Sequence, residues 1–263
     1  MRDGYVLQVR NLVAVPLLVV LTLLGGPAVA AEVEPLPTGT DVDYQLGGAI
    51  DAPAHVGIVV RDREEPPQEG RYNVCYVNGF QTQPQEKRFW RKRPQLLLHD
   101  RTGDLVVDEA WGEWLLDLRT AEKRKRISRI VGRWTAGCAE DGFDAVEYDN
   151  LDSFTRSDGL LRRGHALRYA RLLTKRAHRE GLSVGQKNLA GFDGHRVGYD
   201  FAVSEECGRY DECGAYVADY GDQVLMVEYR TRDFRRTCEQ HGATHAVVLR
   251  DRDLSPKGVH SWC

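Results

Sequence analysis

Short apolar runs at regular intervals constrain the fold of this chain more than any other feature. Eight such runs occur, each about five residues long, rich in β-branched or aromatic residues and bounded by Gly, Asp or Asn, as is typical of strands. They occupy residues 55–60, 73–77, 113–118, 143–148, 182–186, 200–204, 223–229 and 245–249. The sequence therefore predicts a core built from eight short strands.

Amphipathic segments separate several of these runs and predict helices between the strands. Residues 120–138 collect their apolar side chains on one helical face and their charges on the other, with Gly137 as the predicted stop. Residues 158–181 repeat this pattern with an inward row of leucines and end at Gly181. Strands alternating with helices predict an α/β fold, a single (β/α)8 TIM-type barrel.

The segment after the first run separates this barrel from its main alternative, a doubly wound open sheet. Residues 61–72 contain Pro66 and Pro67, so the first crossover is predicted to be short and to lack a full helix. A doubly wound sheet would normally carry a Gly-rich phosphate loop here, and residues 61–70 contain no G-x-G-x-x-G. We therefore favour the barrel.

The first thirty residues have the pattern of a secretory signal peptide. Arg2 and Arg10 form a basic start, a long apolar stretch follows, and Ala28-Val29-Ala30 is an A-x-A cleavage site. We expect residues 1–30 to be removed and the protein to be secreted and extracellular; an uncleaved membrane anchor is the alternative. No later run is long and apolar enough to span a bilayer, so no membrane contact is expected after cleavage.

The remaining chain, about 230 residues, has the size of one barrel domain. Residues 31–54, rich in Pro, Gly and Asp, are predicted to be an N-terminal extension, and residues 55–263 the catalytic barrel. Loss of Arg2, Arg10 and Asp3 with the signal peptide moves the formal net charge from -3 to -4. This mild acidity does not indicate nucleic-acid binding, which favours a basic face, and we expect a monomer.

All six cysteines lie after the predicted signal peptide. An even number in an exported chain indicates up to three disulfides, and six cysteines allow fifteen pairings, among which the sequence does not choose. We favour Cys207–Cys213, which closes a short loop, and Cys238–Cys263, which ties down the C-terminus, with Cys75 and Cys138 remaining. A zinc site is the alternative, but no C-x-x-C or H-x-x-x-H spacing supports it, and we expect no metal and no other cofactor.

Residues 143–154, with the sequence FDAVEYDNLDSF, carry an unusual density of negative charge directly after a predicted strand. Four carboxylates and one amide fall within nine residues: Asp144, Glu147, Asp149, Asn150 and Asp152. Such carboxylates repel one another, and enzymes place paired carboxylates where their pKa values can be pushed apart. The segment therefore indicates chemistry rather than an ordinary loop.

In a parallel barrel the active site gathers at the C-terminal ends of the strands, and nearly every predicted strand here ends in polar residues. Glycoside hydrolysis needs two carboxylates from such ends, one to protonate the leaving oxygen and one to attack the sugar or activate water. We predict Asp149 and Glu205 as this catalytic pair. Substrate contacts are predicted for Asp62, Tyr76, Asn78, Asp117, Asp144, Glu147, Asn150, Asp152, Lys187, Asn188, Glu228 and Tyr229.

Several of these side chains also allow a structural interpretation. Asp149 could cap a loop, and Glu205 with Glu206 could favour a following helix through its dipole. Lys187 is predicted to be a buried ion-pair partner, with Glu147 beside it, rather than a Schiff-base lysine, because the surrounding carboxylates would raise its pKa.

Aromatic side chains are the second requirement of a sugar site, because their faces stack on the apolar side of a pyranose ring. Five tyrosine and phenylalanine residues lie near the predicted rim, although residues of these types more often pack in the core: Tyr76, Tyr148, Phe154, Tyr210 and Tyr229. The tryptophans at positions 111, 114 and 134 are expected to be structural.

Six motifs occur in the order and spacing of glycoside hydrolase family 114, which the chain resembles over residues 42–263: CYVNG, EWLLDLR, GFDAVEYDNLDSF, GLSVGQKN, DFAVSEECGRYDEC and VEYR. The resemblance implies a (β/α)8 fold and hydrolysis of α-1,4-linked galactosamine polymers, the activity of an endo-α-1,4-polygalactosaminidase. It implies that Asp149 is the catalytic aspartate and that Glu205 is the glutamate of the family's E-x-C motif. Its K-N and E-Y pairs fall on Lys187-Asn188 and Glu228-Tyr229.

The chain departs from the family pattern in the loops rather than at the predicted catalytic pair. Of the acidic run usual on the first strand only Asp62 is retained, the second strand leads into Asn78-Gly79-Phe80-Gln81, and the D-G of the fourth-strand motif is Asp144-Ala145. These departures concern the substrate subsites.

The resulting prediction is a secreted endo-glycosidase whose partner is a cationic, galactosamine-containing polysaccharide. Free galactosamine units carry ammonium groups, which a groove lined by carboxylates would favour over a neutral glycan. A non-catalytic carbohydrate-binding barrel is the first alternative. A metal-dependent hydrolase is the second, with Mg²⁺ or Ca²⁺ held by Asp144, Glu147, Asp149 and Asp152. Retention or inversion stays open, because it depends on the separation of the two carboxyl groups.

Overall fold

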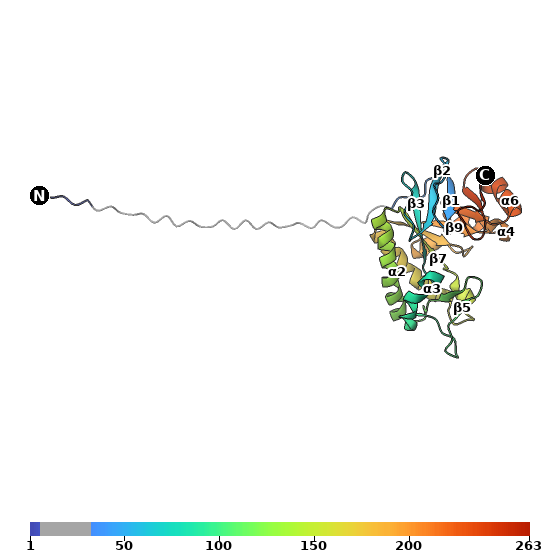
Figure 1. Cartoon of the computed structure of the whole chain (residues 1–263), viewed down its shortest axis with the longest axis horizontal. Coiled ribbons are helices and arrows are strands. Elements are labelled where there is room, and N and C mark those ends of the chain that lie inside the picture. The colour runs from blue at the N-terminus through green and yellow to red at the C-terminus, as the bar shows by residue number, and fades with distance from the viewer. Residues whose placement is uncertain (6–32) are drawn as a thin grey trace.

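Parallel strands that curve into a nearly closed barrel dominate the architecture (Figure 1). The computed structural model describes residues 1–5 and 33–263, and in this part of the chain the barrel sheet has nine strands. Eight run parallel, in the order β1 (Asp41–Gln45), β2 (Val56–Asp62), β3 (Tyr72–Asn78), β7 (Ala145–Asp149), β8 (Ser183–Lys187), β9 (Phe201–Glu205), β10 (Val224–Glu228) and β11 (Ala246–Arg250). The ninth, β12 (His260–Trp262), pairs antiparallel with β11.

Side chains join the two ends of this sheet. Arg250 on β11 lies 3.2 Å from the carboxylate of Asp43 on β1, and both side chains are fully buried. The ring of His260 on β12 contacts the same carboxylate at 2.9 Å, and the indole of Trp262 donates to the carbonyl of Val42 on β1. These contacts close the barrel at the seam between β1 and β11, which places the C-terminus beside β1.

Helices cover the outside of the sheet, as the amphipathic patterns predicted. The longest are α2 (Ala121–Asp141), α3 (Arg163–Arg179), α5 (Cys213–Tyr220) and α6 (Thr231–His241), with short α1 (Lys87–Arg91), α4 (Cys207–Tyr210), η1 (Pro84–Glu86), η2 (Pro94–Leu96), η3 (Ser153–Arg156) and η4 (Gly194–Val197). The side chain of Thr120 caps the start of α2. The helix runs past the predicted stop at Gly137 and ends at Gly142, whose φ of 93° favours glycine.

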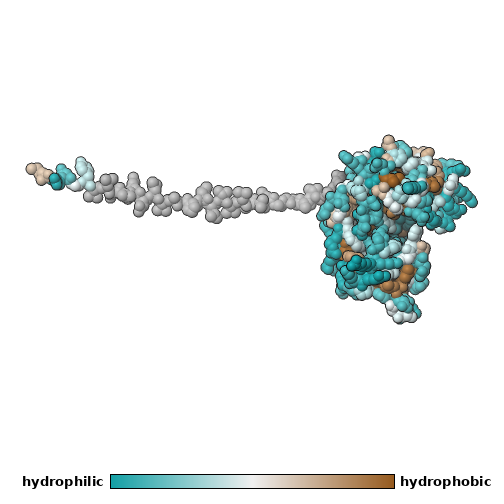
Figure 2. Space-filling view, in the orientation of Figure 1, coloured by the Kyte–Doolittle hydropathy of each residue, from teal (hydrophilic) through white to brown (hydrophobic). Residues whose placement is uncertain are grey.

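Alternation along the strands separates two apolar regions. Inward side chains such as Val60, Val74 and Val203 fill the barrel, whereas Val146 and Met226 point outward and pack under the helices. The charged faces of the helices turn to solvent, and the face of the molecule in Figure 2 is mostly hydrophilic. The (β/α)8 prediction is confirmed, and so is the short first crossover, because the segment between β2 and β3 contains no helix.

The structure corrects two strand assignments. One predicted barrel strand lies in a different sheet, and one barrel strand lies where none was predicted. Residues 113–118, predicted as the third barrel strand, instead contain β6 (Glu113–Leu115) of a separate antiparallel sheet with β4 (Gln81–Thr82) and β5 (Val107–Asp108). The vacant place in the barrel belongs to β1, which lies inside the segment predicted as an N-terminal extension. Its sequence, DVDYQ, carries polar residues that only the folded barrel satisfies, so hydropathy alone did not reveal it.

Three disulfides fasten the outer elements. Cys75–Cys138 joins β3 to α2, Cys207–Cys213 joins α4 to α5, and Cys238–Cys263 joins α6 to the C-terminus. Both favoured pairings are therefore confirmed. In the described part of the chain no helix has the length and apolar character needed to cross a membrane. The predicted cleavage site after Ala30, and nearly all of the predicted signal peptide, lie outside the described residues.

Candidate active site

A cavity of about 560 Å³ opens at the C-terminal ends of β7, β8 and β9. This is the end at which barrel enzymes place their catalytic groups. The cavity brings together eight of the predicted site residues, which are Tyr76, Asp149, Asn150, Asp152, Lys187, Asn188, Glu205 and Tyr229. Both predicted catalytic carboxylates are among them.

Lys187, at the end of β8, stands at the centre of this group. Its ammonium nitrogen lies 3.1 Å from Glu147, 3.3 Å from Asp149 and 3.2 Å from Glu205, and its side chain is 2% exposed. Burial alone would lower the pKa of Lys187, but the charges of Asp149 and Glu205 outweigh it and hold the pKa well above its usual value. The lysine is therefore cationic, as an ion-pair partner must be and a Schiff-base nucleophile must not.

Asp149, the last residue of β7, is held in its ionised form. Tyr76 donates a hydrogen bond to Oδ2 at 2.7 Å, and the backbone N–H of Asn150 donates to Oδ1 at 2.7 Å. Burial would raise the pKa of Asp149, but the charge of Lys187 and these hydrogen bonds more than offset it, so the pKa lies below its ordinary value. An ionised carboxylate at this point can act as a nucleophile or a base.

Glu205, the last residue of β9, faces Asp149 across Lys187. Its carboxylate accepts hydrogen bonds from the Tyr229 hydroxyl and, at 3.3 Å, from the amide of Asn188. The Asn188 side chain in turn accepts from the backbone N–H of Glu205 at 2.9 Å, which fixes both residues. One oxygen of Asp149 and one of Glu205 contact the same nitrogen at 3.3 and 3.2 Å, so they are separated by at most 6.5 Å, the sum of these distances.

Glu147 lies beneath the cavity rather than in its wall. Its side chain is fully buried, accepts a hydrogen bond from Tyr44 at 2.7 Å and contacts Lys187. Burial raises the pKa of Glu147 to about 7, although the charge of Lys187 opposes this shift. Glu147 therefore supports Lys187 from below, the role that the sequence suggested as its structural alternative.

Glu113, which was not among the predicted site residues, also lines the cavity. Its Oε2 accepts from Asn78 at 2.9 Å and from Asn150 at 3.3 Å. Burial raises the pKa of Glu113 to about 8; the hydrogen bond from Asn78 opposes the shift and the charge of Asp149 adds to it. The sequence missed this residue because Glu113 begins β6, and the start of a barrel strand would lie at the opposite end from the active site.

Four other residues predicted to contact substrate lie elsewhere. Asp117 pairs with Arg119 and Lys123 near the start of α2. Asp144 precedes β7 and accepts from the backbone of Asn73, at the opposite end of the barrel. These two predictions were wrong because each carboxylate is already engaged outside the cavity. Asp62 and Asn78 lie behind the wall, where they bond to cavity residues Gln83 and Glu113.

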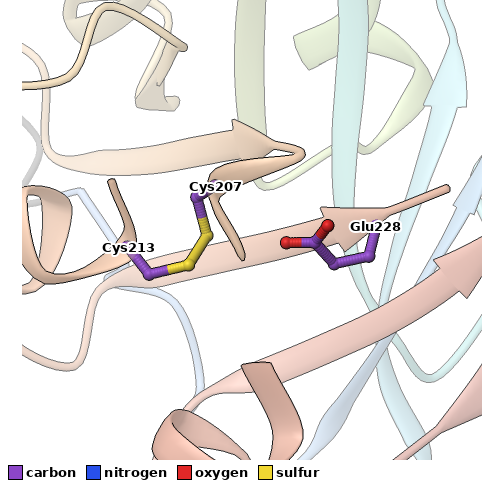
Figure 3. A group of neighbouring side chains, drawn as sticks. All are labelled: Cys207, Cys213 and Glu228. Atoms are coloured by element: carbon purple, nitrogen blue, oxygen red, sulfur yellow. A yellow bond between two sulfur atoms is a disulfide. The ribbon is translucent and has the colours of Figure 1, made fainter. Parts of the chain in front are cut away.

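Glu228 also differs from its prediction, because it points outward from the barrel. It accepts from the backbone N–H of Gly208 at 2.6 Å and from Thr237 on α6. It forms, with Cys207 and Cys213, the group in the described residues that has the spacing of metal ligands (Figure 3). The two sulfur atoms are bonded to each other, so neither is a thiolate available to a metal.

The carboxylates considered for a metal-dependent hydrolase do not converge. Asp149 and Asp152 line the cavity, Glu147 lies below it, and Asp144 is at the other end of β7. Asp152 is also paired with Arg156 at 2.9 Å. The four carboxylates of residues 143–154 therefore have different surroundings and do not form one metal site.

A second cavity of about 540 Å³ adjoins the first. The two share a wall formed by Trp111, Asp152, Arg156, Asn188, Glu205, Tyr229 and Arg252. Trp111 was expected to be structural, but it is 58% exposed at this shared wall. The cavities together make a cleft that passes on both sides of Glu205.

Backbone strain concentrates around this cleft. Asn150, Asn188, Leu189 and Glu206 all have φ between 54° and 69°, a region that residues with a Cβ seldom adopt. Each of these residues follows the end of a strand and lines one of the cavities. Strain of this kind persists where the surrounding structure fixes a functional geometry.

Comparison with known proteins agrees with this description. The model of glycoside-hydrolase family GH114 matches residues 26–263. The structure of Aspergillus fumigatus Ega3 in complex with galactosamine is similar with a TM-score of 0.73 at 21% identity, covering 88% of this chain and 98% of that chain. The glycoside hydrolase domain of PelA from Pseudomonas aeruginosa has a TM-score of 0.55 at 15% identity, covering 85% and 98%. At these identities both structures show the shared fold alone. The chain matches no curated protein sequence.

Proposed function

The chain belongs to glycoside hydrolase family GH114, and from that premise we propose that it cleaves α-1,4-linked galactosamine polymers with Asp149 and Glu205 as its catalytic pair. The observation that carries the proposal is the placement of both carboxylates on one buried lysine at the mouth of a barrel. Two carboxyl groups flanking the scissile bond are what glycoside hydrolysis requires.

In this mechanism Asp149 is the nucleophile. Its lowered pKa keeps it ionised, and the upper limit of 6.5 Å on the separation of one oxygen pair permits the retaining arrangement, in which the carboxyl groups are about 5–5.5 Å apart; the product anomer decides between retention and inversion. Protonated Glu205 donates to the glycosidic oxygen while Asp149 bonds to the anomeric carbon. Glu205 then removes a proton from the water that releases the sugar from Asp149.

Lys187 serves both steps. Its ammonium group contacts one oxygen of Asp149 and one oxygen of Glu205, so a single cation holds the nucleophile and the acid/base side by side. Tyr229 and Asn188 hold the Glu205 carboxylate in place through both steps.

The charges of the cleft support a cationic polysaccharide as the substrate and partner. Carboxyl groups outnumber basic groups in the first cavity, five against three, without Glu113, whose pKa of about 8 leaves it uncharged at neutral pH: Asp108, Asp149, Asp152, Glu205 and Asp253 against Arg156, Lys187 and Arg252. An excess of carboxylates attracts the ammonium groups of galactosamine. The solved complex of Ega3 with galactosamine supports the same substrate class.

The protein is proposed to act outside the cell. Three disulfides suit an oxidising compartment, and the N-terminal sequence has the pattern of a secretory signal peptide. A polysaccharide too large to enter the cell would be met there.

The test is incubation of the purified protein with deacetylated and acetylated α-1,4-galactosaminan, with reducing ends counted and the product anomer read by NMR. Wild-type protein should release α-anomers, faster from the deacetylated polymer. Asp149→Asn and Glu205→Gln should each lower kcat by at least about 10³-fold, while Glu122→Gln, on an exposed side chain of α2, should not. Near-wild-type activity in either catalytic variant would remove that residue from the mechanism.

A further inference from the structure

The cleft has room for sugar beyond the catalytic pair. The second cavity begins at Glu205 and extends away from Asp149, with a wall formed by Tyr210, Glu212 and Tyr216. These three residues do not line the first cavity. A polymer whose scissile bond lies at Glu205 would therefore continue into a compartment with its own side chains.

A short disulfide-closed loop, residues 207–213, supplies much of that wall. Cys207 and Cys213 are bonded across a sequence separation of only 6, and both are buried. Figure 3 shows the Glu228 carboxylate of β10 directed toward this disulfide. Glu228 accepts from the N–H of Gly208, and a Cβ on Gly208 would lie 2.1 Å from the Thr237 hydroxyl, so only glycine fits here. The loop is thus clamped at its base.

Two side chains on this clamped loop remain available. Tyr210 ends α4 with 58% of its surface exposed, and the guanidinium of Arg209 lies 5.1 Å from its ring. Glu212 is also exposed, and among the ion pairs of the described residues none involves it. The neighbouring Glu206, by contrast, is already neutralised by Arg209 and Arg252, each at 2.8 Å.

We propose that the disulfide-closed loop forms a second sugar subsite, in which Tyr210 stacks on a galactosamine ring and Glu212 pairs with its ammonium group. The inference rests on the proposed substrate. An aromatic face attracts a cation as well as the apolar face of a sugar, and an exposed carboxylate accepts a charge-assisted hydrogen bond. The disulfide fixes both side chains before substrate arrives, which lowers the entropy that binding must lose.

Binding to an inactive background separates this subsite from catalysis. The probe is a six-unit α-1,4-galactosamine oligomer, titrated calorimetrically into Asp149→Asn protein, with galactosamine monosaccharide as the short comparison. Adding Tyr210→Ala or Glu212→Gln should weaken binding of the oligomer by roughly tenfold and leave the monosaccharide unaffected. Tyr210→Phe, which keeps the ring, should retain the affinity, and so should the surface control Glu122→Gln.

Opening the loop tests the role of the disulfide. Cys207→Ala/Cys213→Ala should weaken binding of the oligomer as much as Tyr210→Ala does, while thermal unfolding shows that the barrel is intact. If this variant does not fold, the Tyr210 and Glu212 variants still decide the question, since both side chains are at the surface.

The outcomes distinguish this subsite from the proposed hydrolysis. Unchanged oligomer affinity in Tyr210→Ala and Glu212→Gln would overturn the subsite even if wild-type protein releases reducing ends. Weakened affinity in both, together with no hydrolysis by wild-type protein, would support the subsite and overturn the hydrolase proposal. Failure of the oligomer to bind Asp149→Asn protein would overturn the subsite outright.

Discussion

At the scale of single residues, the site depends on one lysine that serves three carboxylates. Lys187 keeps its positive charge although it is buried, because Asp149 and Glu205 pair with its ammonium group. Glu147 contacts the same group from below. A buried cation without these partners would lose its proton. Its chief effect on chemistry is to lower the pKa of Asp149.

Removing that charge should shift the pH profile. In wild-type protein the lowered pKa keeps Asp149 ionised into acidic solution; in Lys187→Met the pKa rises, so the ionised form is lost at a higher pH. The acidic limb of kcat/KM should therefore move to higher pH. The measurement is a pH–rate profile with deacetylated galactosaminan.

Lys187→Arg is the matched control, because it keeps the charge and should keep the acidic limb in place even where kcat falls. An unshifted limb in Lys187→Met would show that the lysine acts only through packing.

The residues that the sequence predicted well are those whose partners lie on adjacent strand ends. Asp149, Lys187 and Glu205 each end a strand, so the rule for parallel barrels placed them together before the structure did. Glu113 and Trp111 were not predicted as cavity residues. Glu113 lies in the small antiparallel sheet and Trp111 in the turn before β6, and no local sequence pattern indicates that these segments line the cavity. Glu228 ends a strand too, but strand alternation turns it outward.

At the scale of elements, the exchange between β1 and residues 113–118 shows what hydropathy could not distinguish. Residues 113–118 have the composition of a buried strand, and they are buried, but β6 pairs within the separate antiparallel sheet and not within the barrel. β1 carries Asp43 and Gln45, which pair with Arg250 and Arg61 inside the fold. Only tertiary contacts make such polar residues acceptable in a barrel strand.

The seam between β1 and β11 should be correspondingly sensitive. Asp43→Ala leaves the buried guanidinium of Arg250 without its carboxylate and should lower the free energy of unfolding by about 3–5 kcal/mol. The measurement is urea unfolding followed by circular dichroism.

The surface ion pair between Glu122 and Arg126 provides the control, since its side chains are 79% and 40% exposed. Glu122→Ala should cost less than about 1 kcal/mol. Equal losses in the two variants would mean that the seam pair does not hold the barrel closed.

At the scale of the whole molecule, different interactions stabilise the barrel and the layer that covers it. Apolar strands fill the barrel, whereas the disulfides tie helices and the C-terminus to it. The three bonds span very different lengths of chain, with sequence separations of 63, 25 and 6. A bond that closes a longer loop removes more freedom from the unfolded chain.

Replacing each cysteine pair by alanine should therefore destabilise the protein in that order. Loss of Cys75–Cys138 should cost about 4 kcal/mol, and loss of Cys207–Cys213 about 2 kcal/mol, measured by urea unfolding of the two double variants. Affinity for the galactosamine oligomer should follow the opposite order, because Cys207–Cys213, which closes the shorter loop, is the disulfide whose loop lines the cleft. If the Cys207–Cys213 variant lost the most stability, this disulfide would stabilise the fold as a whole rather than position the substrate loop. The proposal that barrel stability and cleft geometry depend on different disulfides would then be wrong.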